Sequence, residues 1–415
     1  MKILHTADWH IGKRLDRFPR IEEQRAVLEE IVDLTHREDP DLVLVAGDLW
    51  DTFNPGSDAQ ELLYRTLRDL ADDGRRAVVA IAGNHDSPDR VTAPEVLART
   101  HGIVLSGYPD ESIPAFTAGA VTATQPEPGL VELSIDRPAT TGVPVRIISV
   151  PYAIEARLRR ALGDAGDADS VDAGLQSLLA SRWRTLAERH CRTPGVHLMV
   201  AHLLFSAEGV PAEEEPDGER PIGHIGGAPA VSTAVIPPEI QYVACGHLHR
   251  PHAVPGPTAV RYAGSPLSYS FAETGQTKSV TIVELEPRAA EGSLFAEPAV
   301  TEHALSAGRP LVRHRAASVA DALTWLEEHP AALVELSIEL DEYLSGADRR
   351  RLHEAHDGIV TIVPIVAGVG AAGGDRPRID PTADMRSLFV RYFEERTGAP
   401  PDAAVLDLFS EVIAE

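Results

Sequence analysis

The chain has 415 residues, which is too many for one ordinary hydrophobic core, so two or three domains are expected. Its 63 acidic side chains outnumber 38 Lys and Arg, which argues against binding nucleic acid or an anionic membrane through net charge alone. Two cysteines are too few for a disulfide framework, and neither a signal peptide nor an apolar run long enough to cross a bilayer is visible. We therefore expect a cytoplasmic protein without a membrane span.

Short apolar runs rich in Val and Ile recur in the N-terminal part of the chain. Each run ends abruptly in glycine or polar residues, which predicts buried strands. The runs span residues 2–8, 41–48, 77–84, 145–152, 196–202 and 242–247. Apolar residues also recur on one face of Glu22–Arg37 and of Ala59–Leu70, and this spacing predicts two amphipathic helices. Strands that alternate with helices indicate an α/β fold.

The sequence pattern changes beyond residue 285. Residues 286–298 are linker-like, and a smaller strand and helix unit follows. Its predicted strands lie at 310–316, 332–340 and 359–367, and its predicted helices at 318–329 and 348–355. A stretch rich in Gly and Pro then resembles a flexible connector. The predicted organisation is a large domain at 1–285, a small α/β domain at 286–367, a linker at 368–381 and a helical tail at 382–415.

The tail carries two amphipathic helical patterns. Met385, Leu388, Phe389, Tyr392 and Phe393 form the apolar stripe of the first, and Val405, Leu408, Phe409 and Val412 form that of the second. Packing of two short helices against each other alone would leave part of both apolar stripes exposed to water. We expect the tail to dock on another surface, and packing back on the small domain is the alternative.

Residue types that bind metals follow five of the six apolar runs. They are Asp8, His10, Asp48, Asn84, His202, His247 and His249, with His85 directly after Asn84. One such motif alone is more often a turn or a hydrogen-bonded buried histidine. In α/β sheets, however, the carboxyl ends of the strands line one crevice, so residues far apart in sequence can meet there. Asp, His and Asn without cysteine suit divalent ions such as manganese, iron or zinc, and seven ligands indicate two ions.

The motifs DWH, GDLWD, GNHD, AH and GHLH together resemble the calcineurin-like metallophosphoesterase superfamily. The longer stretches ILHTADWHIGK, LVAGDLWDTFNP, IAGNHDSPDR, CGHLHRP and RYAGSPLSYSF resemble its SbcD family, the nuclease subunits of bacterial SbcC and SbcD complexes. This resemblance extends over nearly the whole chain. It implies a sheet sandwich flanked by helices, followed by a small α/β capping domain that binds DNA and by a tail that binds the SMC-like ATPase SbcC.

The same resemblance implies a manganese-dependent nuclease that acts on duplex ends as an exonuclease and on hairpins and single strands as an endonuclease. Such proteins serve DNA repair, recombination and replication at the nucleoid, as a homodimer within a heterotetramer. The chain has no GxxxxGK[ST] loop, so the ATPase activity is expected from the partner. A phosphoesterase for nucleotides or phosphoproteins is one alternative function, and a scaffold protein with a vestigial site is another.

Carried over by resemblance, the ligands divide into two sets that share Asp48. One set is Asp8, His10, Asp48 and His249, and the other is Asp48, Asn84, His202 and His247. His85 is expected to be the general acid for the departing 3′ oxygen, since an imidazole titrates near neutral pH; orienting a ligand is its alternative role. Some relatives have histidine where GDLWD has Asp51, so the role of Asp51 stays open.

Local positive charge follows the motifs and could hold the DNA backbone, although a solvated surface role is the alternative for each residue. The candidates are Lys13, Arg14, Arg17, Arg20, Arg90 and Arg250. The acidic loop at 206–221 follows His202 and either gates the site or is inert. For the homodimer, exposed apolar residues are expected at Leu62, Leu63, Tyr64, Val96 and Leu97, with core packing as the alternative.

Overall fold

The computed structural model describes residues 1–152, 171–207, 209–210, 230–289, 296–341 and 344–366, with single positions between 389 and 409. The chain divides into two compact units. Unit 1 comprises Met1–Ile338 with Ser345–Val363, and unit 2 comprises Glu339–Leu344 with Pro364–Glu415. All the predicted metal-binding residues belong to unit 1. Among the described residues, no helix is both long and apolar enough to cross a membrane.

The first sheet contains six described strands in the order β18-β17-β1-β4-β5-β6. Four of them are parallel to one another: β1 (Lys2–Thr6), β4 (Leu42–Val45), β5 (Ala77–Ile81) and β6 (Ile103–Ser106). β17 (Ser279–Glu284) and β18 (Ala299–Ala304) complete one edge as antiparallel strands. The boundary predicted at residue 285 therefore falls inside this sheet, because β18 follows it and pairs with β17.

The second sheet has the strand order β15-β16-β14-β11-β10-β9-β8-β7. Its parallel centre consists of β10 (Pro144–Val150), β11 (Val196–His202), β14 (Tyr242–Gly246) and β16 (Ala259–Tyr262). The antiparallel flanks are β7 (Phe116–Ala118), β8 (Val121–Glu127), β9 (Leu130–Ile135) and β15 (His252–Val254). All six strands predicted from the apolar runs are thus confirmed, three in each sheet.

The two sheets face each other across a shared core. On β4, Leu42 and Leu44 pack in the same apolar cluster as Val145 and Ile147 of β10. The alternate residue Val43 packs on the outer side instead, against helices α1 (Ile21–Glu38) and α2 (Ser57–Ala71). This period of two places each strand between two apolar layers. The sandwich flanked by helices is confirmed.

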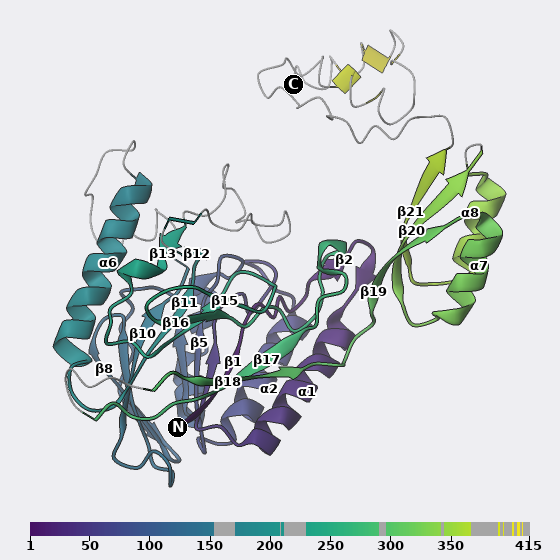
Figure 1. Cartoon of the computed structure of the whole chain (residues 1–415). Coiled ribbons are helices and arrows are strands. Elements are labelled where there is room, and N and C mark those ends of the chain that lie inside the picture. Colours follow the sequence, from purple (N-terminus) through teal and green to yellow (C-terminus); the bar gives the residue numbers. More distant parts are fainter. Residues whose placement is uncertain are drawn as a thin grey trace. The chain divides into compact units, whose positions relative to one another are not determined.

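Helices cover the outer faces of both sheets (Figure 1). The two helices predicted at 22–37 and 59–70 are confirmed as α1 and α2, whose Leu, Ile and Val residues fill the outer core of the first sheet. Helix α6 (Val171–His190) covers the second sheet, where Trp183 is buried. Short elements complete the body: α3 (Pro88–Thr92), α4 (Glu95–Ala98), β12 (Phe205–Ser206), β13 (Val231–Ser232) and the 3-10 helices η1 (Arg99–His101), η3 (Thr233–Val235) and η4 (Phe271–Glu273).

The small α/β region has the predicted order of elements. A sheet of β19 (Leu311–Ala316), β20 (Leu333–Leu340) and β21 (Ile359–Val366) accompanies α7 (Val319–Glu328) and α8 (Gly346–Ala355). The side chains of Ser318 and Ser345 cap the two helices by accepting hydrogen bonds from the backbone N–H groups of Asp321 and Asp348.

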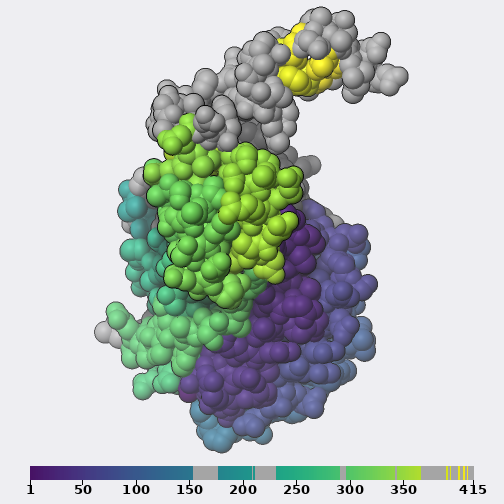
Figure 2. All heavy atoms as spheres, turned by 90° about the vertical axis from the view of Figure 1, so that its right-hand side faces the viewer, coloured from purple at the N-terminus to yellow at the C-terminus, as the bar shows by residue number. Residues whose placement is uncertain are grey.

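A short hairpin near the N-terminus meets this region. The hairpin comprises β2 (Arg14–Leu15) and β3 (Phe18–Pro19). Leu15 shares an apolar cluster with Leu311 and Leu333, and the Arg17 guanidinium donates a hydrogen bond to the backbone oxygen of Ile359 at 3.0 Å. Figure 2 shows the small region, in green, beside the purple N-terminal segment. The hairpin therefore links the DWH motif to the small sheet within unit 1.

Candidate metal centre

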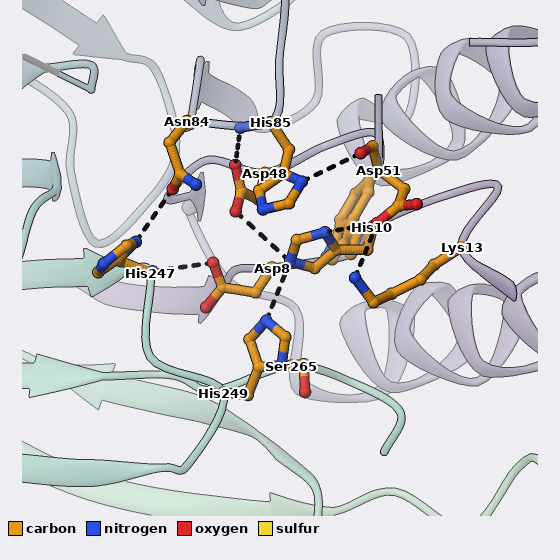
Figure 3. Close-up of polar contacts among 12 residues, drawn as sticks. Asp8, His10, Lys13, Asp48, Asp51, Asn84, His85, His247, His249 and Ser265 are labelled. Atoms are coloured by element: carbon orange, nitrogen blue, oxygen red, sulfur yellow. Dashed lines mark hydrogen bonds and ion pairs between the residues drawn. The ribbon is translucent and has the colours of Figure 1, made fainter. Parts of the chain in front are cut away.

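Seven buried side chains converge where the strands of both sheets end. Figure 3 labels all of them except His202. They come from the loop after β1 (Asp8, His10), the loops after β4 (Asp48) and β5 (Asn84), the end of β11 (His202) and the loop after β14 (His247, His249). Each has an exposed fraction of 3 % or less. The structure therefore brings together all the metal ligands predicted from sequence.

The backbone at the site adopts conformations that side chains seldom allow. Asp8, His10, Asp48 and His247 have φ values of 54°, 43°, 48° and 110°. Non-glycine residues in this left-handed region cost about 1–3 kcal/mol each, and such residues cluster at functional sites. Gly246 is required because a Cβ atom there would lie 1.9 Å from the backbone oxygen of Ala46. This close approach lets β14 deliver both histidines of GHLH to the same cavity.

One ligand group gathers around His10. The Nε2 atoms of His10 and His249 lie 3.0 Å apart, and Nε2 of His10 lies 3.4 Å from Oδ2 of Asp48. Imidazole nitrogens and carboxylate oxygens are ligands that divalent ions such as zinc take in proteins. Asp8 completes the group, and its Oδ2 atom is buried without a hydrogen-bond partner. These residues fit a divalent ion.

A second ligand group gathers around Asn84. Its Oδ1 atom lies 2.8 Å from Nε2 of His202 and 3.0 Å from Nδ1 of His247. Nε2 of His202 is also 3.5 Å from Oδ2 of Asp48. The same Asp48 oxygen therefore lies near His10 in the first group and near His202 in the second. A single carboxylate that serves both groups is the arrangement expected of a two-ion site.

The electrostatics of the cavity favour bound cations. Burial raises the pKa of the Asp8 carboxyl to about 7, because the ionised form loses its hydration. Burial lowers the pKa of His10 to about 3, so its imidazole is neutral at pH 7 and has a nitrogen lone pair available for a metal. Divalent ions would supply the positive charge that the two buried aspartates require.

His85 lies beside the first ligand group with one ring nitrogen anchored. Its Nδ1 atom is 3.0 Å from the backbone oxygen of Asp51, and its backbone N–H donates to Oδ1 of Asp48 at 2.9 Å. The opposite atom, Nε2, is buried and has no hydrogen-bond partner. His10, Asp51 and His85 also lie close enough together to form a further candidate metal group. Measuring the metal content of a His85 variant would therefore distinguish a proton donor, whose loss leaves the metal bound, from a ligand, whose loss releases it.

Several residues around the site were not predicted from sequence. The carboxylate of Asp86 accepts hydrogen bonds from the backbone N–H groups of Leu49, Trp50 and Gly83, which ties the GDLWD loop to the GNHD loop. Asp86 is the last residue of the GNHD motif, so the sequence did contain a signal for it. Glu273 and Lys278 form a buried ion pair at 2.6 Å behind His249, and no motif marked them.

The structure corrects one candidate for DNA contact. Arg20 has an exposed fraction of 1 %, and its guanidinium binds Glu23 and the backbone oxygen of Ser268, so it cannot reach a nucleic acid. Arg14, Arg17, Arg90 and Arg250 are exposed, whereas Lys13 is half-buried and pairs with Asp51 at 2.8 Å. Most residues of the two predicted tail helices, and most of the acidic loop at 206–221, lie outside the described residues.

Comparisons with known proteins agree with this geometry. A family model described as calcineurin-like phosphoesterase matches residues 1–124. The SbcD subunit of nuclease SbcCD from Bacillus subtilis (strain 168) is 36% identical over 418 aligned residues, which cover 99% of this chain and 97% of the relative. The chain belongs to the SbcD family of SbcCD nuclease subunits.

A second member of this family supports the assignment. The SbcD subunit of nuclease SbcCD from Rhodobacter capsulatus is 34% identical over 297 aligned residues, which cover 70% of this chain and 68% of the relative. Membership of the SbcD family makes the chain a metal-dependent nuclease, a hydrolase of phosphodiester bonds. The candidate metal centre lies where the motifs of this family converge.

Proposed function

We propose that the chain is a manganese-dependent DNA nuclease that cuts duplex ends, hairpins and single strands together with an SbcC-type SMC-like ATPase. The single observation that carries this proposal is the pair of ligand groups that share Oδ2 of Asp48. The relatives are named as subunits of an SbcCD nuclease, which supports the partner and the substrate class. The same proposal places this nuclease at the nucleoid, where it would act in DNA repair, recombination and replication.

In this proposal, one ion is held by Asp8, His10, Asp48 and His249, and the other by Asp48, Asn84, His202 and His247. Two such ions would neutralise the charge that develops on a phosphodiester and lower the pKa of the attacking water. The protein contributes the positions of the ligands. Asp48 is fixed by the backbone N–H of His85, and Asp8 by the backbone N–H of His247 at 2.8 Å.

His85 is the proposed general acid. The backbone oxygen of Asp51 anchors Nδ1, so in the imidazolium form both nitrogens carry protons and Nε2 can give its proton to the departing 3′ oxygen. Nε2 has no hydrogen-bond partner in the structure, so no protein group occupies the position from which it would donate. A histidine held in this way loses no proton to a competing acceptor among the described residues.

The DNA backbone is proposed to follow the exposed arginines near the site. Arg14 and Arg17 belong to the β2–β3 hairpin, Arg90 follows GNHD, and Arg250 follows GHLH. Arginines suit phosphate oxygens because the guanidinium forms paired hydrogen bonds with them. Local charge of this kind would offset the net charge of −25.

A homodimer is proposed through α2 and α4. Val96 and Leu97 have exposed fractions of 59% and 71%. Leu97 lines an apolar groove of about 450 Å³ together with Tyr64 and Leu67. For Leu62 and Leu63 the core-packing alternative holds, because both pack in the core of the first sheet with exposed fractions of 3% and 1%. The dimer surface therefore comprises Tyr64, Val96 and Leu97.

Cleavage assays on defined DNA test the function directly. The full chain would be incubated with linear duplex and with hairpin DNA in Mn²⁺, Mg²⁺ or a chelator, with and without the ATPase. We expect cleavage of both substrates in Mn²⁺, none with the chelator, and stimulation by the ATPase and ATP. Cleavage of a nucleotide monoester but of neither DNA would contradict the proposed substrate class.

A further inference from the structure

The carboxylate of Glu273 lies directly behind the ligand His249. Oε1 of Glu273 is 3.4 Å from Nδ1 of His249, whereas Nε2 of the same ring faces Nε2 of His10. Glu273 is at the end of η4, where the backbone N–H of Tyr269 also donates to its Oε1 atom at 3.0 Å. With an exposed fraction of 3%, Glu273 is shielded from bulk solvent. Glu273 is thus placed to act on the metal through His249.

Lys278 holds this carboxylate in place. Its ammonium donates to Oε2 of Glu273 at 2.6 Å, to Oγ of Ser265 at 3.0 Å and to the backbone oxygen of His249 at 2.9 Å. Lysine occurs at only three positions in the chain, Lys2, Lys13 and Lys278. A compact ammonium with three donors suits these converging acceptors better than the planar fork of arginine. The ion pair therefore positions both the backbone and the ring of His249.

A second lysine holds a carboxylate near His10, where the contact with the ring is an ion-pair distance and not a hydrogen bond. Oδ1 of Asp51 is 3.5 Å from Nδ1 of His10, and the Lys13 ammonium is 2.8 Å from the same oxygen (Figure 3). His202, in the other ligand group, differs: its Nδ1 atom is 2.8 Å from the backbone oxygen of Ala46, a neutral acceptor. The two histidines whose Nε2 atoms meet at 3.0 Å are thus both backed by a carboxylate that pairs with a lysine.

We propose that Glu273–Lys278 and Asp51–Lys13 are positioning pairs that make the His10 and His249 site the tighter of the two metal sites. This inference rests on the proposed two-metal function. A carboxylate behind a histidine fixes the tautomer that leaves the lone pair on Nε2, and it raises the basicity of that ligand. A backbone carbonyl fixes the tautomer with less gain in basicity. The inference also assigns a role to Asp51, whose carboxylate acts on His10.

Manganese titration of the metal-free full-length chain tests the inference. Binding would be followed by the EPR signal of free Mn²⁺, with calorimetry as a second readout. The wild-type chain should bind two ions in two resolved steps. Glu273→Gln keeps the size of the side chain but removes its charge, so the tighter step should weaken about 10–100-fold while the weaker step stays unchanged. Equal affinities in the wild type, or an equal loss at both steps in the variant, would overturn the inference.

A double variant separates positioning from simple structural support. Glu273→Gln alone leaves the Lys278 ammonium buried and unpaired, which destabilises the fold. Glu273→Gln with Lys278→Met removes both charges, so the thermal stability of the metal-free chain should recover. The tighter metal step should stay weak, since the carboxylate behind His249 is still missing. Recovery of metal affinity together with stability would show a structural role only and would overturn the inference.

A matched control excludes a general effect of losing a carboxylate. Glu335 forms an ion pair with Arg313 at 2.7 Å in the small sheet, and Glu335→Gln should leave both metal steps unchanged. The wild-type titration also tests the proposed function separately. A wild-type chain that binds only one ion would contradict the two-metal proposal itself, whereas two unequal steps that Glu273→Gln leaves unaltered would contradict the positioning role alone.

Discussion

Individual residues at the site divide into those proposed to hold ions and those proposed to act beside them. His85 is anchored through Nδ1 and Asp48 lies between two histidines, so replacing each should give a different pattern of metal loss. For each variant at this scale, the predictions therefore concern both its metal content and its rate of DNA cleavage. Both quantities would be measured on the same preparation, so that a loss of fold is not mistaken for a loss of chemistry.

His85→Ala should leave both ions bound while DNA cleavage falls about 10²–10⁴-fold, because the variant lacks the proton donor for the 3′ oxygen. Metal content by mass spectrometry and the single-turnover cleavage rate check this. His36→Ala is a matched control, since His36 is exposed near the end of α1. If His85→Ala loses metal in step with activity, His85 is a ligand in the group with His10 and Asp51.

Asp48→Ala should reduce the content of both ions, because its Oδ2 atom lies near His10 and near His202. His10→Ala should affect mainly one ion, since its Nε2 atom belongs to the first ligand group. Metal content at equal free Mn²⁺ compares the two variants. The bridging role would be refuted by equal losses.

Secondary-structure elements were predictable where the sequence pattern reflects burial. The strands that carry the ligands are buried along their length, as β4 and β11 illustrate, and their abrupt ends marked the site. β18 was missed because its sequence AVTEHA is mostly exposed, and only pairing with β17 identifies it as an edge strand. Apolar spacing alone also cannot tell whether a helix face meets its own core or a partner, which is why both roles stayed open at Leu62 and Leu63 until the fold showed them in the core.

Leu97→Glu should convert the proposed dimer into a monomer, because it places a charge in the apolar groove beside Tyr64. Sedimentation of the full-length chain at several concentrations measures the change. Val300→Glu is the control, since Val300 is 40% exposed on the edge strand β18, where a charge is harmless. A wild-type chain that stays monomeric at all concentrations would contradict the dimer.

Across the whole molecule, the sequence motifs predicted the fold and the convergence of the seven candidate ligands, because the strands deliver these side chains to one place. Contacts between distant segments could not be predicted in this way. Positive charge near DWH suggested a DNA contact for Arg20, but Glu23 and the backbone of Ser268 bind its guanidinium. Glu273 and Lys278 likewise lie outside every motif and reach His249 only through the fold.

Truncation after Arg378 should abolish stable association with the ATPase, because it removes both apolar stripes of the tail. Metal binding and basal Mn²⁺-dependent cleavage should persist, since all seven proposed ligands belong to unit 1. A pull-down with the ATPase and a cleavage assay without it measure the two effects. A truncated chain that still binds the ATPase with wild-type affinity would refute the docking role of the tail.

The two-metal centre is tested most directly by anomalous diffraction from crystals of the full-length chain grown with Mn²⁺. We predict two anomalous peaks, one among Asp8, His10 and His249 and the other among Asn84, His202 and His247. Both peaks should lie within bonding distance of the Asp48 carboxylate. A single peak, or a peak held by His10, Asp51 and His85 in place of either, would contradict the assignment.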